Sequence, residues 1–173
     1  MLDKIRSKYI LKKLFEIIKN KRKLNIIKYN KRIVGKLNID KQDFEIYTKL
    51  NDFNDKYNKY NKIYDIDIKE INLNQRYIKN KGLEELSEIK FKGLKKLNLR
   101  ENQISDINIL EKLNFKELKK LDLSKNNIYF IDVFEEVKFE KLEELNLKGN
   151  RMSLIYDGRI ISKLKSLLKT LTI

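Results

Sequence analysis

Three segments of the chain repeat one pattern at a spacing of 24 residues. Residues 94–104, 118–128 and 142–152 each read L-x-x-L-x-L-x-x-N-x-(I/M), so the same five positions hold in fixed register through three copies. A period of this length is typical of chains that stack one structural unit on the next. Stacked units make an extended curved surface, and such surfaces usually bind other molecules.

The apolar positions inside each copy predict a short strand. Two leucines alternate with one polar residue, which is the period of a strand that buries one face. Stacking of the copies would place these strands side by side in a parallel sheet, with the leucines inward and the intervening residues toward solvent. The leucine pairs are Leu97 and Leu99, Leu121 and Leu123, and Leu145 and Leu147.

An asparagine follows each strand at the point where the chain must turn. These residues are Asn102, Asn126 and Asn150. A side-chain amide both donates and accepts hydrogen bonds, so it can satisfy backbone groups that a turn leaves without partners. We therefore predict a structural ladder of asparagines that runs from repeat to repeat.

Degraded copies of the pattern stand on either side of the three clear ones. Residues 68–78 keep the apolar positions but carry an arginine where asparagine is expected, and residues 168–173 begin a further copy. Between the strands, apolar residues such as Ile107, Leu110 and Leu113 have helix-like spacing. The last copy stops within its strand, which predicts an open sheet edge that belongs to a longer array or is covered by a partner.

The repeated pattern resembles the leucine-rich repeat family, and the likeness covers residues 68–173. The resemblance implies an α/β repeat solenoid, with parallel strands on the concave face and helical or irregular segments on the convex face. We accordingly divide the chain into an α-helical N-terminal element at residues 1–65 and a leucine-rich repeat domain at residues 66–173. That domain would hold about four repeats and the start of a fifth.

In the leucine-rich repeat family the concave face usually engages partners, through the variable positions around the two strand leucines. Equivalent variable positions of successive repeats form columns across the sheet. Ser124 lies in the same column as Arg100 and Lys148 and is expected to be exposed. The cations of the middle repeats would suit an acidic protein surface, with a larger gain in association rate than in affinity. The alternative is a face that is simply solvated. The candidate partner-binding residues are Lys96, Asn98, Arg100, Lys120, Asp122, Lys125, Glu144, Asn146 and Lys148.

The net charge of +15 is concentrated near the N-terminus. Residues 1–36 hold 13 basic and two acidic side chains, whereas residues 66–173 hold 22 basic and 17 acidic ones. The repeat domain is therefore expected to have an ordinary mixed-charge surface. Leu11, Leu14 and Ile18 have helical spacing in the basic segment, which fits a small helical cap on the first repeat. The basic face could instead bind anionic lipid or nucleic acid, although no groove-reading motif accompanies it.

Residues 5–33 also resemble a divergent F-box. The likeness rests on the run from Tyr9 to Ile18, followed by Lys23-Leu24 and by residues 29–32. That family pairs such a helix with leucine-rich repeats in substrate receptors of cullin ubiquitin ligases. The resemblance implies that the N-terminal element docks on the cullin linker protein.

An aromatic stripe follows the basic segment. Apolar residues, most of them aromatic, recur every three or four positions: Phe44, Tyr47, Leu50, Phe53, Tyr57, Tyr60 and Tyr64. On a helix they would form one apolar face, and packing of this face against the end of the repeat domain is the interpretation we favour. The alternatives are partial disorder of the stretch around Tyr57 and stacking of nucleobases on the aromatic rings.

The composition argues against catalysis. The chain contains no histidine and no cysteine, so an imidazole base and a thiolate nucleophile are both excluded. No glycine-rich phosphate loop occurs, and we expect no cofactor and no metal site. No segment approaches the roughly 20 apolar residues of a membrane span. We therefore predict a non-enzymatic protein-interaction module in the cytoplasm or nucleus, with the F-box-like receptor and the basic nucleic-acid or membrane binder as alternatives.

Overall fold

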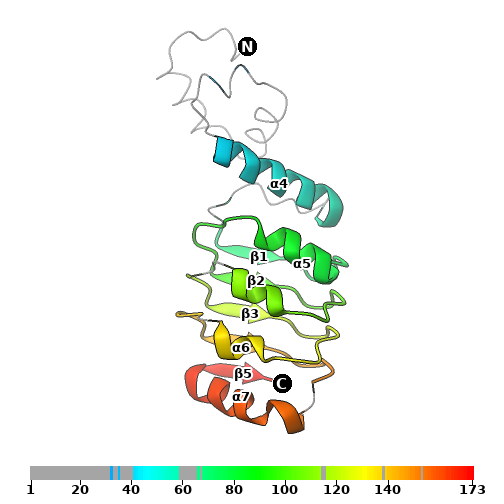
Figure 1. Ribbon diagram of the computed structural model, residues 1–173, viewed down its shortest axis with the longest axis vertical. Helices are drawn as coiled ribbons and strands as arrows, with labels where there is room; N and C mark the ends of the chain where they lie inside the picture. Colours follow the sequence, from blue (N-terminus) through cyan, green and yellow to red (C-terminus); the bar gives the residue numbers. More distant parts are fainter. Residues whose placement is uncertain are drawn as a thin grey trace.

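The computed structural model describes residues 32, 35, 41–58, 66, 68–113, 116–137, 139–152 and 154–173, and the structural statements that follow concern these residues. Short strands alternate with helical segments along the chain (Figure 1). In chain order the elements are α4 (Lys41–Tyr57), β1 (Glu70–Asn72), α5 (Lys79–Ser87), β2 (Lys96–Asn98), the 3-10 helix η2 (Asn108–Lys112), β3 (Lys120–Asp122), α6 (Val133–Glu136), β4 (Glu144–Asn146), α7 (Leu154–Leu167) and β5 (Thr170–Thr172).

The five strands form one parallel sheet in the order β1-β2-β3-β4-β5, so each strand pairs with the next one along the chain. This confirms the predicted parallel sheet. The central residue of each of the first four strands is buried, and Leu97, Leu121 and Leu145 stand in register with one another. The degraded copies at residues 68–78 and 168–173 supply β1 and β5. The apolar period therefore predicted the register of the sheet correctly.

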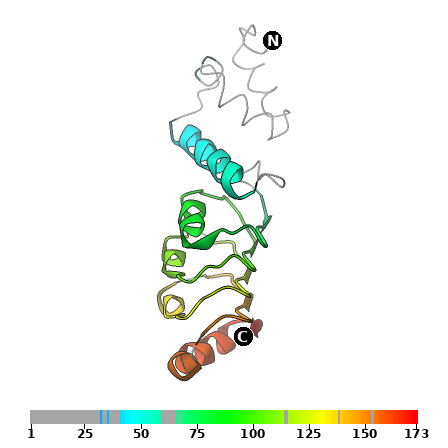
Figure 2. The same cartoon turned by 90° about the vertical axis from the view of Figure 1, so that its right-hand side faces the viewer.

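The helical segments lie together on one side of the sheet (Figure 2). They bury apolar side chains against the strand leucines, and the core runs as one layer between helices and sheet. The segments differ in form, because the stretch between strands varies in length and in its apolar residues. The segment around Leu110 makes a five-residue 3-10 turn, whereas α7 is an α-helix of 14 residues. The face of the sheet on which none of the described helices lies is called the open face below.

Helix α4 packs on α5 beside the first strand. Leu50 and Phe53 of α4 are fully buried and belong to the same core as the strand leucines. The Tyr57 ring packs near Phe53, with 5.1 Å between the ring centroids. Lys56 and Glu85 form an ion pair of 2.7 Å on the solvent side of this contact. The aromatic stripe thus packs against the first repeat at these positions. The described residues do not include residues 59–64, the side chains of residues 44 and 47, or nearly all of the F-box-like segment.

Gly82 allows the close approach of α4 and α5. A Cβ atom at this position would lie 2.8 Å from Ile78 Cγ2 and 3.0 Å from the Tyr57 ring. We expect Gly82→Ala to lower the free energy of unfolding by about 1 kcal/mol, because the clash outweighs the gain in helix propensity. In α7 a Cβ at Gly158 would meet nothing within 4 Å, so Gly158→Ala should raise the same quantity by up to about 1 kcal/mol. Urea titrations of the two variants test this, and effects of equal sign would contradict it.

Candidate functional site

A hollow of about 460 Å³ lies on the open face of the sheet. All five strands contribute to it, because the outward side chains of each strand line its walls while the buried central residues form its floor. These outward residues stand in two rows across the strands. The first row is Glu70, Lys96, Lys120, Glu144 and Thr170, and the second row is Asn72, Asn98, Asp122, Asn146 and Thr172.

The first row is a line of two ion pairs. Lys96 of β2 and Lys120 of β3 stand side by side in register. Each lysine pairs with a glutamate on its other side, Lys96 with Glu70 of β1 and Lys120 with Glu144 of β4. The Lys96 Nζ lies 2.7 Å from Glu70, and the Lys120 Nζ lies 2.6 Å from Glu144. The charges of this row therefore cancel, which reduces the basic character that the two lysines had suggested for the middle repeats. Exposed pairs of this kind contribute little to stability.

The first four residues of the second row cap the turns that follow β1 to β4. Each Oδ1 accepts the backbone N–H of the residue two positions on, at 3.0 Å for Asn72, 2.9 Å for Asn98 and Asp122, and 3.1 Å for Asn146. This is the usual bond of an asparagine or aspartate in a turn. The Nδ2 groups of the three asparagines have no partner among the described residues.

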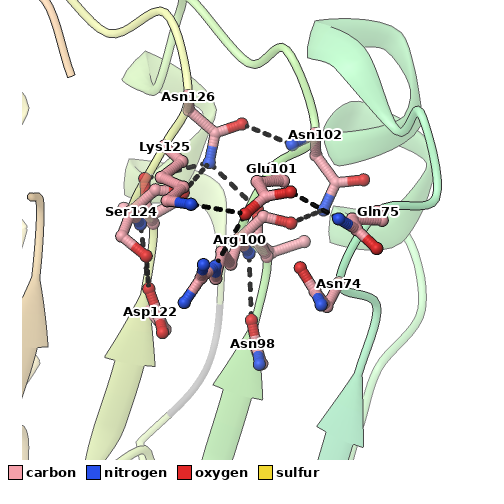
Figure 3. A network of polar contacts seen from close by, with 12 residues as sticks. Asn74, Gln75, Asn98, Arg100, Glu101, Asn102, Asp122, Ser124, Lys125 and Asn126 are labelled. Carbon is pink, nitrogen blue, oxygen red and sulfur yellow. Dashed lines mark hydrogen bonds and ion pairs between the residues drawn. The ribbon is translucent and has the colours of Figure 1, made fainter. Parts of the chain in front are cut away.

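Above the rows, one carboxylate joins three repeats (Figure 3). Glu101 accepts hydrogen bonds from Gln75 of the preceding repeat and from Arg100 beside it, the latter at 3.0 Å. Lys125 of the following repeat lies 3.2 Å away from the same carboxylate. The Gln75, Arg100 and Lys125 donors together lower the pKa of Glu101 to about 2. The carboxylate is thus ionised throughout the physiological range.

A second carboxylate has the same character near the N-terminal ends of the strands. Lys169 and Lys119 lie 2.8 Å and 3.0 Å from Glu143, and they lower its pKa to about 2.

The two lowered pKa values predict a loss of stability in acid. An unfolded glutamate titrates near its ordinary pKa of 4.5, so the stabilisation is fully present above that pH and disappears as the pH falls from about 4.5 toward 2. We expect thermal melts of the Glu101→Gln and Glu143→Gln double variant to depend less on pH over this interval than melts of the unaltered protein. Parallel slopes for the two proteins would contradict the assignment.

The asparagine ladder lies directly behind this network. The Asn102 Oδ1 accepts the backbone N–H groups of Arg76 and Ile78, at 2.9 Å and 3.2 Å, and its Nδ2 donates to two carbonyl oxygens. Asn126 accepts from the N–H groups of Asn102 and Ile104 and donates to three carbonyl oxygens, so its side chain makes five hydrogen bonds (Figure 3). Asn150 makes three bonds with described residues. Each of the three asparagines therefore links the turns of consecutive repeats.

One residue of the binding columns was placed wrongly by the sequence analysis. Ser124 was expected to be exposed, but only 3 % of it is accessible. Its Oγ donates to Asp122 Oδ1 at 2.6 Å, and its carbonyl accepts from Asn126. The physical reason is length: Arg100 and Lys148 in the same column reach solvent, whereas a serine side chain ends below the tips of its neighbours.

Exposed aromatic side chains lie on the loops beyond the ladder, where the sequence analysis placed no candidate residue. Tyr77 and Phe130 are 69 % and 72 % exposed. Arg151 donates to the Tyr129 hydroxyl at 2.7 Å and lies 5.7 Å from the centre of that ring. Tyrosine and arginine are enriched in interface hot spots. The signal in the sequence was the aromatic pair Tyr129-Phe130, directly after the last repeated position of its copy.

Comparison with known families identifies part of this structure. A family model described as Leucine Rich repeat matches residues 94–107. Comparison with curated proteins gives no match. The leucine-rich repeat match begins just before β2, contains Arg100, Glu101 and Asn102, and ends before η2. The F-box-like resemblance of residues 5–33 receives no support from the comparisons.

In the part of the chain that the structure describes, no group of three or more histidine, cysteine, aspartate or glutamate side chains is arranged to hold a metal ion. None of the described helices combines the length and the apolar character needed to cross a membrane.

Proposed function

We propose that this chain is a leucine-rich repeat solenoid that acts without catalysis as a cytoplasmic protein-interaction module and binds its partner through the open face of the sheet. The observation that carries the proposal is the hollow on this face, to which all five strands contribute polar side chains. A surface built from successive repeats offers one partner several contacts at regular spacing. The leucine-rich repeat match at residues 94–107 supports the same interpretation.

The chemistry of the open face favours a protein over a small molecule. Sites for small molecules are mostly apolar and enclose the ligand. Here the walls carry ion pairs and the Nδ2 groups of Asn72, Asn98 and Asn146, which have no partner among the described residues, while the strand leucines contribute only the floor. Spaced polar groups around a limited apolar area are typical of protein interfaces.

Affinity purification with matched charge variants tests the proposal. The open-face variant combines Lys96→Glu and Lys120→Glu, and the control combines Lys112→Glu and Lys165→Glu on the helical side. Both variants change the net charge equally, and thermal melts verify that both are folded. We expect at least one protein to be recovered by the unaltered chain and the control and to be lost with the open-face variant.

Two results would contradict the proposal. In the first, every recovered protein depends on the helical side and none depends on the open face. In the second, the recovered proteins disappear after nuclease treatment, which would indicate binding of nucleic acid through basic residues.

A further inference from the structure

Arg100 differs from the other cations of the middle repeats. The ammonium groups of Lys96, Lys120 and Lys125 each lie within 3.2 Å of a glutamate oxygen, so their charges are met at close range. Arg100 uses only its Nε in this way, in the bond of 3.0 Å to Glu101. Its Nη1 and Nη2 groups have no partner among the described residues, and 41 % of its side chain is exposed. The two terminal nitrogens are therefore available to a ligand.

The position of Arg100 is defined before any ligand arrives. Glu101 holds the Nε, and the same carboxylate is held in turn by Gln75 and Lys125 from the two neighbouring repeats. A guanidinium that is anchored at Nε presents its remaining donors as a planar fork, and this fork matches the two oxygens of a carboxylate. Figure 3 shows the guanidinium on the side of the network that carries Asn98 and Asp122.

Asn98 supplies a second donor next to this fork. It is the last residue of β2 and precedes Arg100 by two residues, and its Oδ1 accepts the Arg100 backbone N–H at 2.9 Å. This bond fixes the amide so that the oxygen faces the turn. The Nδ2 then faces away from the turn and has no partner among the described residues. A carboxylate bound by the Arg100 fork would lie beside this amide.

Asp122 provides the opposing charge. It stands in register with Asn98 on the next strand and is the one carboxylate of the second row. Its Oδ1 accepts from the backbone N–H and the hydroxyl of Ser124, and no cation of the described residues pairs with it. A ligand in the fork would therefore meet the negative charge of Asp122 in addition to that of Glu101, which Arg100 and Lys125 offset, and this disfavours a dianion more than a singly charged group.

We propose that Arg100 and the Nδ2 of Asn98 form a binding site for one aspartate or glutamate side chain of the partner, and that Asp122 limits the affinity of this site. The proposal rests on the proposed function, since it names the chemistry that the open face recognises.

The chain offers a matched variant for the role of Asp122. The equivalent positions in the neighbouring repeats are Asn72, Asn98 and Asn146, and each makes the same bond to the turn. Asp122→Asn should therefore keep the turn while it removes the negative charge. Arg100→Lys is the complementary variant, because it keeps the positive charge and removes the fork.

The test is an NMR titration of the full chain at low ionic strength with an end-blocked oligoglutamate peptide, and with oligoglutamine as the neutral control. We expect oligoglutamate to shift the Arg100 Nε–H and the Asn98 Nδ2 resonances. Arg100→Lys should weaken binding about tenfold, the usual consequence of losing a bidentate pair. Asp122→Asn should tighten binding by about threefold to tenfold, a gain that a folding defect cannot imitate.

Three outcomes would overturn the proposal. Equal affinity of Arg100→Lys and the unaltered chain would show that the fork is not used. Unchanged affinity of Asp122→Asn would remove the role of Asp122. In parallel titrations with inorganic phosphate and with acetate, followed at the Arg100 resonances, tighter binding of phosphate would assign the site to phosphate. In each case the proposed function stands or falls separately, because the purification experiment depends on Lys96 and Lys120.

Discussion

Replacing Asn126 by leucine is expected to lower the free energy of unfolding by about 3 kcal/mol or more. Leucine has nearly the shape of asparagine, so the change removes hydrogen bonds rather than volume. Asn126 is 4 % exposed, and its side chain makes five hydrogen bonds. All five partners are backbone groups, and they belong to its own repeat and to the preceding repeat. Each buried group that loses its partner costs about 1–3 kcal/mol, although neighbouring losses are not additive. Urea titrations measure the effect.

Asn150→Leu is the matched control for this substitution. Asn150 is half-buried and makes three hydrogen bonds with described residues. Water can reach groups that a half-buried side chain releases, so the expected loss is smaller, at about 1 kcal/mol. Equal losses at the two positions would show that the ladder acts through something other than the burial of its hydrogen bonds.

Replacing Phe53 by alanine is expected to cost about 3–4 kcal/mol. The ring is 1 % exposed and belongs to the core that α4 shares with the first repeat. Its removal leaves a cavity between α4 and α5, and nearest-neighbour coupling should pass the loss to the first repeat. We expect amide hydrogen exchange to become faster in both α4 and α5, at Leu83 and Leu86 in particular, with a smaller effect in β3.

The same measurement separates two interpretations of the N-terminal element. A helix that caps the first repeat must share its loss of stability with α5, whereas an independent docking module would lose protection within α4 alone. Leu167→Ala is the control, because this side chain is 67 % exposed and its truncation should change stability by less than about 0.5 kcal/mol. Faster exchange confined to α4 would favour the docking module.

On the open face, the sequence predicted which residues stand side by side but did not predict their ion pairs. The repeat register places Lys96 beside Lys120, and the structure has this register. The register alone suggested a basic area, because it does not say which carboxylate a flexible ammonium group reaches. In the structure the neighbouring strands β1 and β4 supply Glu70 and Glu144, so the charges of Lys96 and Lys120 are both paired.

The burial of residues in the turns was also only partly predictable from the sequence. Arg100 and Lys148 extend to solvent, as predicted for polar residues at this position of the repeat, but Ser124 at the equivalent position is covered and bonded to Asp122. The exposed Tyr129 and Phe130 show the converse, since aromatic residues beyond the ladder could have been assigned to a core on composition alone. Polarity predicts burial well only where a strict period accompanies it.

The sequence by itself determined the sheet. Strand centres, their order and their register follow from an apolar period along the covalent chain, and a shift by one residue would turn every leucine toward solvent. Only the tertiary structure decided which polar groups of the open face are free. Hydrogen bonds and ion pairs depend on distances of about 3 Å between residues of different repeats, and these distances are set by side-chain rotamers and by turns rather than by residue type. For that reason nine candidate residues could be named from the pattern, while the structure was required to show that Arg100 bonds Glu101 through its Nε and that its Nη groups have no partner among the described residues.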